Sequence, residues 1–446
     1  MKKSSMRRLI HGSAYSKKRL KNDRSVLESL LSPKALCFVL LHLIFITKSL
    51  LREIFRGSRF KSFFILNVGG FAHTVMQAEI YFEFLDPNGK VILIYTPNRH
   101  NPLITTLYSD QYTVVDRSKY LLWVNVKDDR KLIEAAERLA IKIVELLSSA
   151  LLKSIKIFSW KSIVSLVPKH SSSIHGQGIE KLFFQLCEGT GTELLKERNL
   201  KCNSIPVELL KVFSEKQGEN TQKYCAFYFR SKGNYKTDHA DDYSRNSREF
   251  SELTEYFACL KSYGYKTLVY GDLIGAGTEE ARNAGAIFCE DIAISRELWN
   301  LWVPIVTEFT IGAPGGGLIV PVKFLKPILV MDGFGYFHAL PNALMTYKLV
   351  KDRHGNLISP FDYIRESPWL LDFPSGHRVE CLGIGIHLEI LAEFILALND
   401  WPQNNNIDME IHKDSALTFS PGAFISKRYS NFIKYSISKE GTKPNE

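Results

Sequence analysis

Residues 307–332 read TEFTIGAPGGGLIVPVKFLKPILVMD, and this stretch decides the fold class. The short apolar run at 309–311 predicts a buried strand, and a glycine-rich loop follows it at 312–317. Residues 318–325 are apolar enough to begin a buried helix, and 328–331 predict a second buried strand. The order strand, loop, helix, strand is a βαβ unit, whose parallel strands favour an α/β sheet.

The loop suggests a chemistry through its backbone. Gly315, Gly316 and Gly317 carry no Cβ, so N–H groups at the start of the following helix are open to a phosphate or diphosphate. The alternative is a tight turn that only lets the helix pack on the sheet. The loop is not a Walker loop, because no Gly-Lys-Ser/Thr follows, and it lacks the glycine spacing of a dinucleotide fold.

The positive charge of the chain is concentrated at its N-terminus. Of 446 residues, the first 62 hold 15 Lys and Arg against 3 Asp and Glu, and the remainder holds 42 against 44. The length suits two or three domains. Because the globular part is nearly neutral, a nucleic-acid-binding surface is not expected. The seven cysteines are scattered without a Cys-x-x-Cys pair, which favours reduced thiols over disulfides or a zinc site.

The N-terminal arm, residues 1–62, contains an apolar run at 35–47. This run is shorter than the roughly 20 residues that span a bilayer. Four cations at helical spacing follow it: Lys48, Arg52, Arg56 and Arg59. An apolar segment flanked by cations suits the headgroup region of an anionic membrane. A buried helix of the fold and a single tilted span are the alternatives.

Two segments of alternating strands and helices follow the arm. Residues 63–212 predict a first domain, 213–223 a polar linker, 224–400 a second domain, and 401–446 a tail whose last helix returns to the first domain. In the first domain the expected strands are 63–68, 91–95 and 112–115, with helices at 71–84 and 132–152. In the second domain the expected strands are 224–229, 266–270, 286–289, 309–311 and 328–331. Such alternation predicts two wound parallel sheets, with sites beyond the carboxyl ends of the strands.

An ordered set of motifs carries a resemblance to a known family. The set comprises Arg230, YSRNS at 243–247, Gly264-Tyr265, Gly271-Asp272, IGAPGGG at 311–317 and KPILVMD at 326–332. It resembles a poorly characterised bacterial family of glycosyltransferases linked to surface polysaccharide or lipopolysaccharide assembly. The match is best over 222–350 and weaker over 63–105. The resemblance implies a GT-B-like α/β fold, in which two Rossmann-like domains face each other across a cleft.

In that family the second domain holds the nucleotide-sugar donor and the first holds the acceptor. The resemblance implies no bound metal, and we expect no cofactor. The expected donor-binding residues are Arg230, Arg245, Asn246, Gly271, Asp272, Gly315, Gly316, Gly317, His338 and Glu389. Each has a structural alternative: an ion pair for either Arg, helix entry for Asn246, packing for His338 and a solvated helix face for Glu389.

Transfer also needs a base that takes a proton from the acceptor hydroxyl. A histidine has a suitable pKa near neutrality, and His73 follows the glycine turn of the first expected strand. We therefore expect His73 to be the catalytic residue. Packing or helix capping is the alternative for a single histidine.

Three functions follow from this reading. The first is a membrane-associated, metal-independent hexosyl- or related transferase that moves sugar from a nucleotide donor to a lipid-linked or polysaccharide acceptor. It would lie at the inner face of the cytoplasmic membrane, on an anionic surface bound by residues 1–60. The second is a nucleotide-sugar epimerase on the same fold. The third is a catalytically diverged binding or scaffold protein, which two differences favour: Val269 and Tyr270 stand where the family has an Arg, and Gly315 and Gly316 where it has a Ser.

Overall fold

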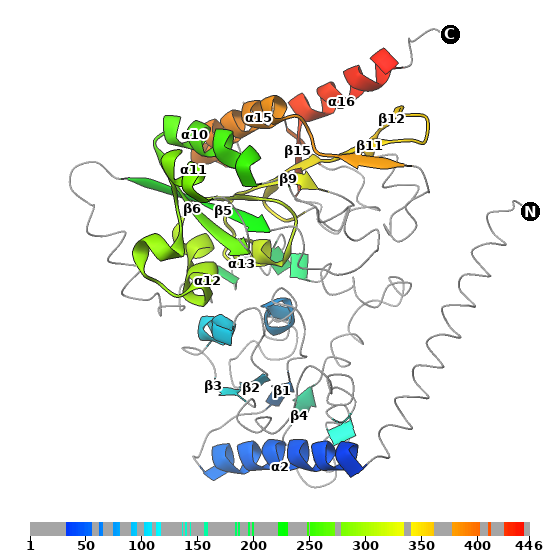
Figure 1. The fold of residues 1–446 in the computed structure, drawn as a ribbon. Helices are drawn as coiled ribbons and strands as arrows, with labels where there is room; N and C mark the ends of the chain where they lie inside the picture. Colours follow the sequence, from blue (N-terminus) through cyan, green and yellow to red (C-terminus); the bar gives the residue numbers. More distant parts are fainter. Residues whose placement is uncertain are drawn as a thin grey trace, which may run out of the picture. The chain divides into compact units, whose positions relative to one another are not determined.

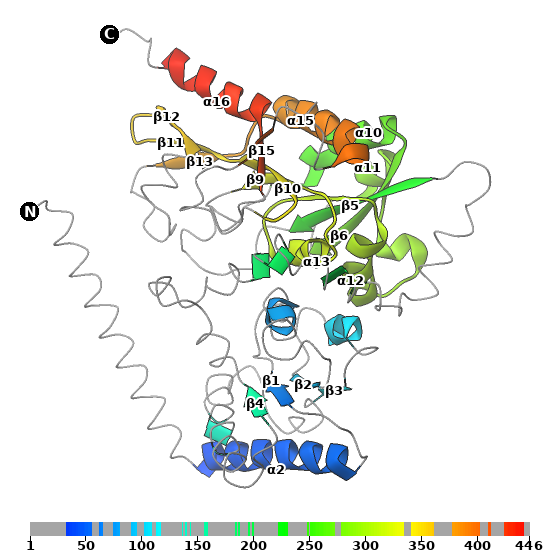
Figure 2. The same ribbon diagram turned by 180° about the vertical axis from the view of Figure 1, so that it is seen from behind.

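The structure of the chain is a computed structural model, shown from two sides in Figures 1 and 2. It describes residues 33–55, 62–65, 75–80, 91–95, 102–108, 113–116, 136, 139–140, 143, 156–158, 183–184, 186–187, 195–196, 199, 222–230, 248, 250–272, 278–333, 340–360, 377–401, 409–411 and 423–440. Packing divides the chain into two units. The first unit comprises residues 1–68, 86–97 and 112–163, and the second comprises 69–85, 98–111 and 164–446.

The first unit contains a four-stranded sheet. Its strands are β1 (Ser62–Ile65), β2 (Val91–Tyr95), β3 (Thr113–Asp116) and β4 (Lys156–Phe158), in the order β3-β2-β1-β4. Every neighbouring pair is parallel. The sequence predicts the first three strands to within about three residues, because each is a short apolar run, and the predicted parallel sheet is confirmed. It does not predict β4.

Helix α2 (Pro33–Phe55) also belongs to the first unit. Its Phe38 and Val39 are buried and form a cluster with Ala136 and Ala140, so one face of the helix is part of the fold. Within the parts of the chain that the structure describes, no helix has both the length and the hydropathy needed to cross a bilayer.

The second unit is built on an eight-stranded sheet in the order β14-β15-β10-β9-β8-β5-β6-β7. Its strands are β5 (Lys223–Arg230), β6 (Tyr265–Asp272), β7 (Ala286–Ile287), β8 (Thr310–Gly312), β9 (Ile328–Gly333), β10 (Ala343–Tyr347), β14 (Met409–Ile411) and β15 (Phe424–Ser426). Seven strands are parallel and only the edge strand β14 is antiparallel. All residues of β8 and β9 are buried, as expected for parallel strands covered on both faces.

The order of these strands is that of a Rossmann-like fold. From β5 the chain builds β6 and β7 outward on one side, and then crosses over to build β8, β9 and β10 on the other. The direction of building therefore reverses between β5 and β8. In wound α/β sheets such a switch point opens a crevice beyond the carboxyl ends of the strands, where ligands bind.

Helices cover both faces of this sheet, as Figures 1 and 2 show. Helices α10 (Thr254–Ser262) and α15 (Ile384–Ala397) lie on one side, and α12 (Arg296–Val306) and α13 (Ile319–Lys323) lie on the other. Other helices with described bounds are η1 (Pro102–Leu107), η4 (Phe250–Leu253), α11 (Thr278–Asn283), η5 (Cys289–Ile292), η6 (Gly316–Leu318), η8 (Leu398–Asp400) and α16 (Lys427–Glu440).

Helix α12 is not predicted from the sequence. Ser295 caps it by accepting a hydrogen bond from the Leu298 N–H at 3.3 Å, and Trp299 is buried and donates its indole N–H to the Val269 carbonyl at 2.7 Å. Its last two turns are almost continuously apolar and contain Pro304. Because proline inside a run argues against a helix, Pro304 hides this element in the sequence.

Two further regions form strands that the sequence does not predict. Residues 343–347 form strand β10 in the large sheet. A small antiparallel sheet consists of β11 (Leu349–Lys351), β12 (Leu357–Ile358) and β13 (Arg378–Glu380). The C-terminal helix α16 packs against α15. The predicted return of the last helix to the first domain stays a prediction.

Candidate functional site

The glycine-rich loop lies at the switch point of the large sheet. Strand β8 ends at Gly312, and the chain then passes through residues 313–315 into the short helices η6 and α13. The predicted strand, glycine loop, helix and strand are therefore confirmed in that order. Strand β5, the neighbour of β8 across the switch point, ends at Arg230. Arg230 pairs in register with Asp272 at the end of β6.

The glycine-rich loop packs closely against Tyr228. A Cβ added to Gly312 would lie 2.6 Å from the Tyr228 Cβ, and one added to Gly315 would lie 2.7 Å from the Tyr228 hydroxyl oxygen. A Cβ on Gly317 would collide with the same ring. The backbone of Gly315 is extended, at φ 174° and ψ 170°, a conformation that any residue adopts. Glycine at 315 is therefore required for space rather than for conformation.

A second tyrosine holds the loop from the neighbouring strand. Tyr270 pairs with Tyr228 across β5 and β6, and their ring centroids are 5.2 Å apart. The Tyr270 hydroxyl donates a hydrogen bond to the Gly317 carbonyl at 3.2 Å. Burial raises the pKa of Tyr270 well above its usual value, so it remains a donor at physiological pH. The loop is thus supported from below by two aromatic rings and one hydrogen bond.

Gly271, at the carboxyl end of β6, is held by α12. Its N–H donates to the Asn300 side-chain oxygen at 2.9 Å, and its carbonyl accepts from the Asn300 amide at 3.2 Å. The φ of Gly271 is 113°, and an added Cβ would collide with the Phe229 carbonyl. This position requires glycine for conformation and for space, because the left-handed region is strained for other residues.

The glycines of the loop at 315–317 are only partly buried. Residues 315–317 are half-buried, and within the described part of the chain their N–H groups have no hydrogen-bond acceptor. Backbone N–H groups in this arrangement attract an anion, most strongly where water is partly excluded. The geometry suits a phosphate group lying over the carboxyl ends of β5 and β8.

A buried cation follows the loop at the end of α13. The Lys323 ammonium lies 2.8 Å from the Glu79 carboxylate, and it donates to the Asn199 side-chain oxygen, also at 2.8 Å. Asn199 in turn donates to the Lys323 carbonyl at 2.8 Å. Lys323 and Glu79 are both buried, so the pair fixes α13 to the helical residues 75–80. Removing either partner would leave a buried charge uncompensated, which is strongly destabilising.

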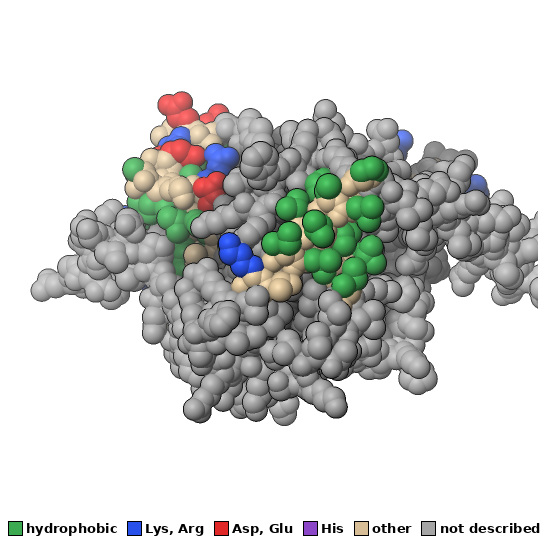
Figure 3. Space-filling view, turned by 90° about the horizontal axis from the view of Figure 1, so that it is seen from below, with side chains coloured by type: hydrophobic (Ala, Val, Ile, Leu, Met, Phe, Trp, Pro, Cys, Tyr) green, Lys and Arg blue, Asp and Glu red, His purple; other side chains and the backbone are tan. Residues whose placement is uncertain are grey.

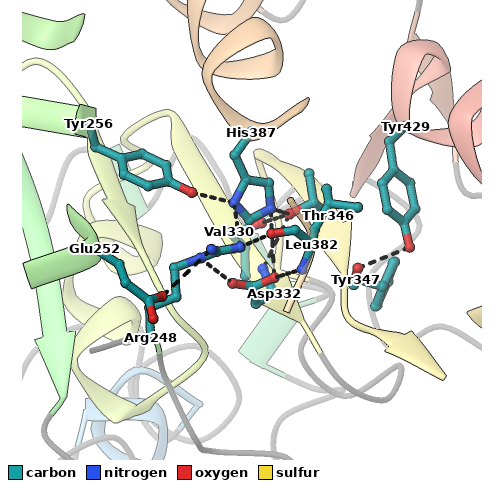
Figure 4. Close-up of polar contacts among 10 residues, drawn as sticks. All are labelled: Arg248, Glu252, Tyr256, Val330, Asp332, Thr346, Tyr347, Leu382, His387 and Tyr429. Carbon is teal, nitrogen blue, oxygen red and sulfur yellow. Dashed lines mark hydrogen bonds and ion pairs between the residues drawn. The ribbon is translucent and has the colours of Figure 1, made fainter. Parts of the chain in front are cut away.

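A buried polar network joins the end of β9 to helices α10 and α15, as Figure 4 shows. The Arg248 Nε donates to Asp332 at 2.9 Å, and the Leu382 N–H donates to the other oxygen of the same carboxylate at 2.9 Å. Arg248 also donates to the Leu382 carbonyl and lies 3.9 Å from the exposed Glu252. Asp332 has a left-handed backbone, with φ 54°. For a residue other than glycine, such a conformation persists only where the surrounding contacts impose it.

His387, from α15, forms the other half of this network. Its Nδ1 accepts a hydrogen bond from the Tyr256 hydroxyl at 2.5 Å, and its Nε2 lies 3.1 Å from the Thr346 hydroxyl oxygen. Thr346 donates its own proton to the Val330 carbonyl, so its oxygen is free to accept the Nε2 proton. These partners select the neutral tautomer with the proton on Nε2.

The charge state of His387 agrees with this tautomer. Burial lowers the pKa of His387 to about 4; the Asp332 carboxylate opposes this shift, and the Arg248 charge adds to it. At neutral pH the ring is therefore uncharged. Because Arg248, Asp332 and His387 are all buried, the network positions the end of β9 and is closed to a substrate.

The structure describes some of the expected site residues and not others. Gly271 and residues 315–317 lie at the carboxyl edge of the sheet, and the backbones of Arg230 and Asp272 end their strands there. Glu389 is exposed on α15 and pairs with Arg428 at 2.6 Å, next to the Glu393–Arg428 pair at 2.5 Å. That pairing matches the solvated-face alternative for Glu389. The remaining expected residues, His73, Arg245, Asn246 and His338, lie outside the described residues.

Several residues of the site were not expected from the sequence. These are Tyr228, Tyr270, Lys323, Arg248, Asp332, Thr346 and His387. Asp332, as an acidic residue ending an apolar strand run, was the one visible signal. Its partners Arg248 and His387 are separated from it by 84 and 55 positions, and no local pattern predicts such pairings. Among the described residues, no group of His, Cys, Asp or Glu could hold a metal ion.

Comparisons with known proteins give distant likenesses. No family model and no curated protein matches the sequence. Among solved structures, a glycosyl transferase family 9 protein from Veillonella parvula DSM 2008 is similar with a TM-score of 0.41 and 10% identity, over 76% of this chain and 97% of that one. The E. coli heptosyltransferase WaaC with ADP-2-deoxy-2-fluoro heptose is similar with a TM-score of 0.33 and 10% identity, over 61% and 89%. Likenesses this distant do not assign a function.

Replacing Gly317 by Ala should lower the free energy of unfolding by about 1–3 kcal/mol, because the new methyl group overpacks against Tyr228. Chemical denaturation measures this loss. The matched control is Gly385→Ala in α15, where an added Cβ meets open space and no loss is expected. In a Tyr228→Leu background the Gly317→Ala cost should shrink. An equal cost in both backgrounds would show that Tyr228 does not set the space requirement.

His387 should make stability depend on pH. Its pKa is about 4 in the folded chain against 6.5 in the unfolded one, so acid protonates the unfolded state first. Stability from this residue is complete above pH 6.5 and is lost as pH falls toward 4. Between pH 7.5 and pH 5 the loss should be about 2 kcal/mol. Denaturation at both pH values should show a smaller loss for His387→Gln; an identical loss would contradict the assignment.

Proposed function

We propose that this chain is a glycosyltransferase that transfers a sugar from a nucleotide-sugar donor to a lipid-linked or polysaccharide acceptor in cell-surface glycan synthesis. One observation supports the proposal: a half-buried glycine loop follows β8 at the switch point, among the seven parallel strands of the large sheet. Three members of the motif set that resembles a glycosyltransferase family belong to this edge, since Arg230, Gly271-Asp272 and the loop lie at the carboxyl ends of parallel strands.

In this proposal the donor diphosphate lies over residues 315–317. The N–H groups of the loop stabilise the negative charge that grows on the diphosphate as the bond from the sugar carbon to phosphate oxygen breaks. Arg230, at the end of β5, adds a bidentate positive charge. Arg245, Asn246 and His338 complete the donor contacts, with Asp272 on sugar or ribose hydroxyls. These cationic and backbone donors replace a metal, so the proposed transfer is metal-independent.

The acceptor side of the proposal rests on His73. The acceptor hydroxyl oxygen attacks the sugar carbon, a new glycosidic bond forms, and the nucleoside diphosphate leaves. The hydroxyl proton passes to His73, whose ordinary pKa suits a base near neutrality. Glycan acceptors of this kind are made at the inner face of a cytoplasmic membrane, where we place the enzyme as a peripheral protein.

A catalytically diverged binding or scaffold protein is the second candidate. It is favoured by Val269 and Tyr270 at the strand positions where the resembling family has an Arg. The Tyr270 hydroxyl supports the glycine loop, a role that an Arg at this position would not fill in the same way. Such a protein would bind a nucleotide-sugar without transferring the sugar. An epimerase would instead convert the donor itself and need no acceptor.

A thermal-shift screen of the full chain against UDP-, GDP-, CMP-, dTDP- and ADP-sugars tests the donor site. At a ligand concentration of about 100 times Kd, binding adds about 2.7 kcal/mol of stability, enough to raise Tm by several degrees. We expect one nucleotide to give a saturable rise that Arg230→Ala abolishes. The control Arg428→Ala removes a cation that pairs with Glu389 and Glu393 on the exposed surface, and it should retain most of the rise.

The two candidate functions give different results in this experiment. No rise with any nucleotide-sugar in a folded sample would contradict a donor site altogether. A rise that Arg230→Ala leaves unchanged would move the site away from β5. A rise without release of nucleoside diphosphate when glycan acceptors are added would favour the binding protein over the transferase.

A further inference from the structure

Helix α2 presents two different faces. Phe38 and Val39 are 6% exposed and pack on Ala136 and Ala140. On the opposite side, Leu36, Leu40 and Ile44 are 56%, 59% and 51% exposed. Residues at i, i+4 and i+8 lie on one side of a helix, so these three side chains form a continuous apolar stripe.

Figure 3 shows this face of the molecule, where hydrophobic side chains gather along the helix. Among the described residues, six large hydrophobic side chains are exposed: Leu36, Leu40, Ile44, Tyr263, Leu396 and Tyr435. Half of them therefore lie on this one stripe. Single exposed apolar residues need no explanation, but a stripe of three on one helix marks an interaction surface.

The charge around the stripe points to its partner. Residues 1–62 hold 15 Lys and Arg against 3 Asp and Glu, whereas the rest of the chain is nearly neutral. Within α2, Lys48 is exposed at the end of the apolar run, and the first turn contains no acidic residue. A second copy of the chain would bring the same positive charge and repel it. An anionic lipid surface complements both the charge and the apolar stripe.

The packing of α2 also determines how it would meet a bilayer. Because Phe38 and Val39 are held in the fold, lipid cannot surround the helix, and only the face carrying Leu36, Leu40 and Ile44 is free. A helix with one apolar face lies in the plane of the membrane, with that face at the boundary of headgroups and acyl chains. Lys48 is near enough in sequence to contact lipid phosphates from the same helix.

We propose that α2 docks this protein on an anionic bilayer, with Leu36, Leu40 and Ile44 inserted among the acyl chains; the net positive charge of residues 1–62 makes an anionic surface more favourable than a neutral one. The inference extends the proposed function by naming the surface on which a lipid-linked acceptor is met.

Co-sedimentation of the full chain with lipid vesicles tests this docking. Phosphatidylcholine vesicles containing phosphatidylglycerol should bind the protein, and vesicles of phosphatidylcholine alone should bind it weakly. The triple variant Leu36→Gln, Leu40→Gln, Ile44→Gln keeps good helix formers on an exposed face. It should bind the anionic vesicles about tenfold or more weakly, because each change withdraws an apolar side chain from lipid.

The matched control is Leu396→Gln with Tyr435→Gln, which removes two exposed apolar side chains of α15 and α16. It should bind vesicles as the unaltered chain does. Failure of the unaltered chain to bind anionic vesicles would overturn the proposal, and so would full binding by the triple variant. Dimerisation that only the triple variant loses would assign the stripe to a second copy instead. Because the assay contains no nucleotide, its result is separate from that of the donor screen.

Discussion

The packing of the Tyr228 ring beneath three glycines controls how the chain leaves the centre of the large sheet. The Cβ and backbone of Tyr228 fill the space that a side chain at position 312 would occupy, and its ring fills that at 315 and 317, so the loop lies directly on β5. Tyr270, one strand further, supports the same loop through its hydroxyl. The consequence is a backbone that packs on Tyr228 on one side and stays half-buried at 315–317, where β8 ends.

The buried charges of the second unit also fix the positions of elements near the glycine loop. Burying an ion pair costs desolvation energy, and it stabilises a fold only when hydrogen bonds satisfy the remaining polar atoms. Asp332 meets this condition with Arg248 and the Leu382 N–H, and it holds the left-handed turn that ends β9. Lys323, on the helix that follows the loop, is paired with the Glu79 carboxylate and donates a hydrogen bond to Asn199. Both clusters specify where elements around the crevice end, and neither is open enough to perform chemistry.

Much of the sheet could be predicted from the sequence because buried parallel strands are short, continuous apolar runs bounded by polar residues. Strands β2, β5 and β9 fit that description and were placed within one or two residues of their ends. Helix α12 was missed because Pro304 lies inside it, and a proline within a run argues against a helix. The glycine loop can be recognised in the sequence as a motif, but the sequence does not show that Tyr228 is the residue that requires these glycines. Tyr228 lies 84 positions before Gly312, and only the parallel pairing of β5 with β8 brings them together.

Hydrogen exchange at residues 315–317 tests the central claim most directly. The full chain is compared with and without the nucleotide-sugar that raises its melting temperature. If the diphosphate lies over the glycine loop, the N–H groups of these residues should exchange more slowly with the nucleotide bound, and those of α2 should be unchanged. Slower exchange confined to another part of the chain, with residues 315–317 unaffected, would contradict the claim that the switch point of the sheet is the donor site.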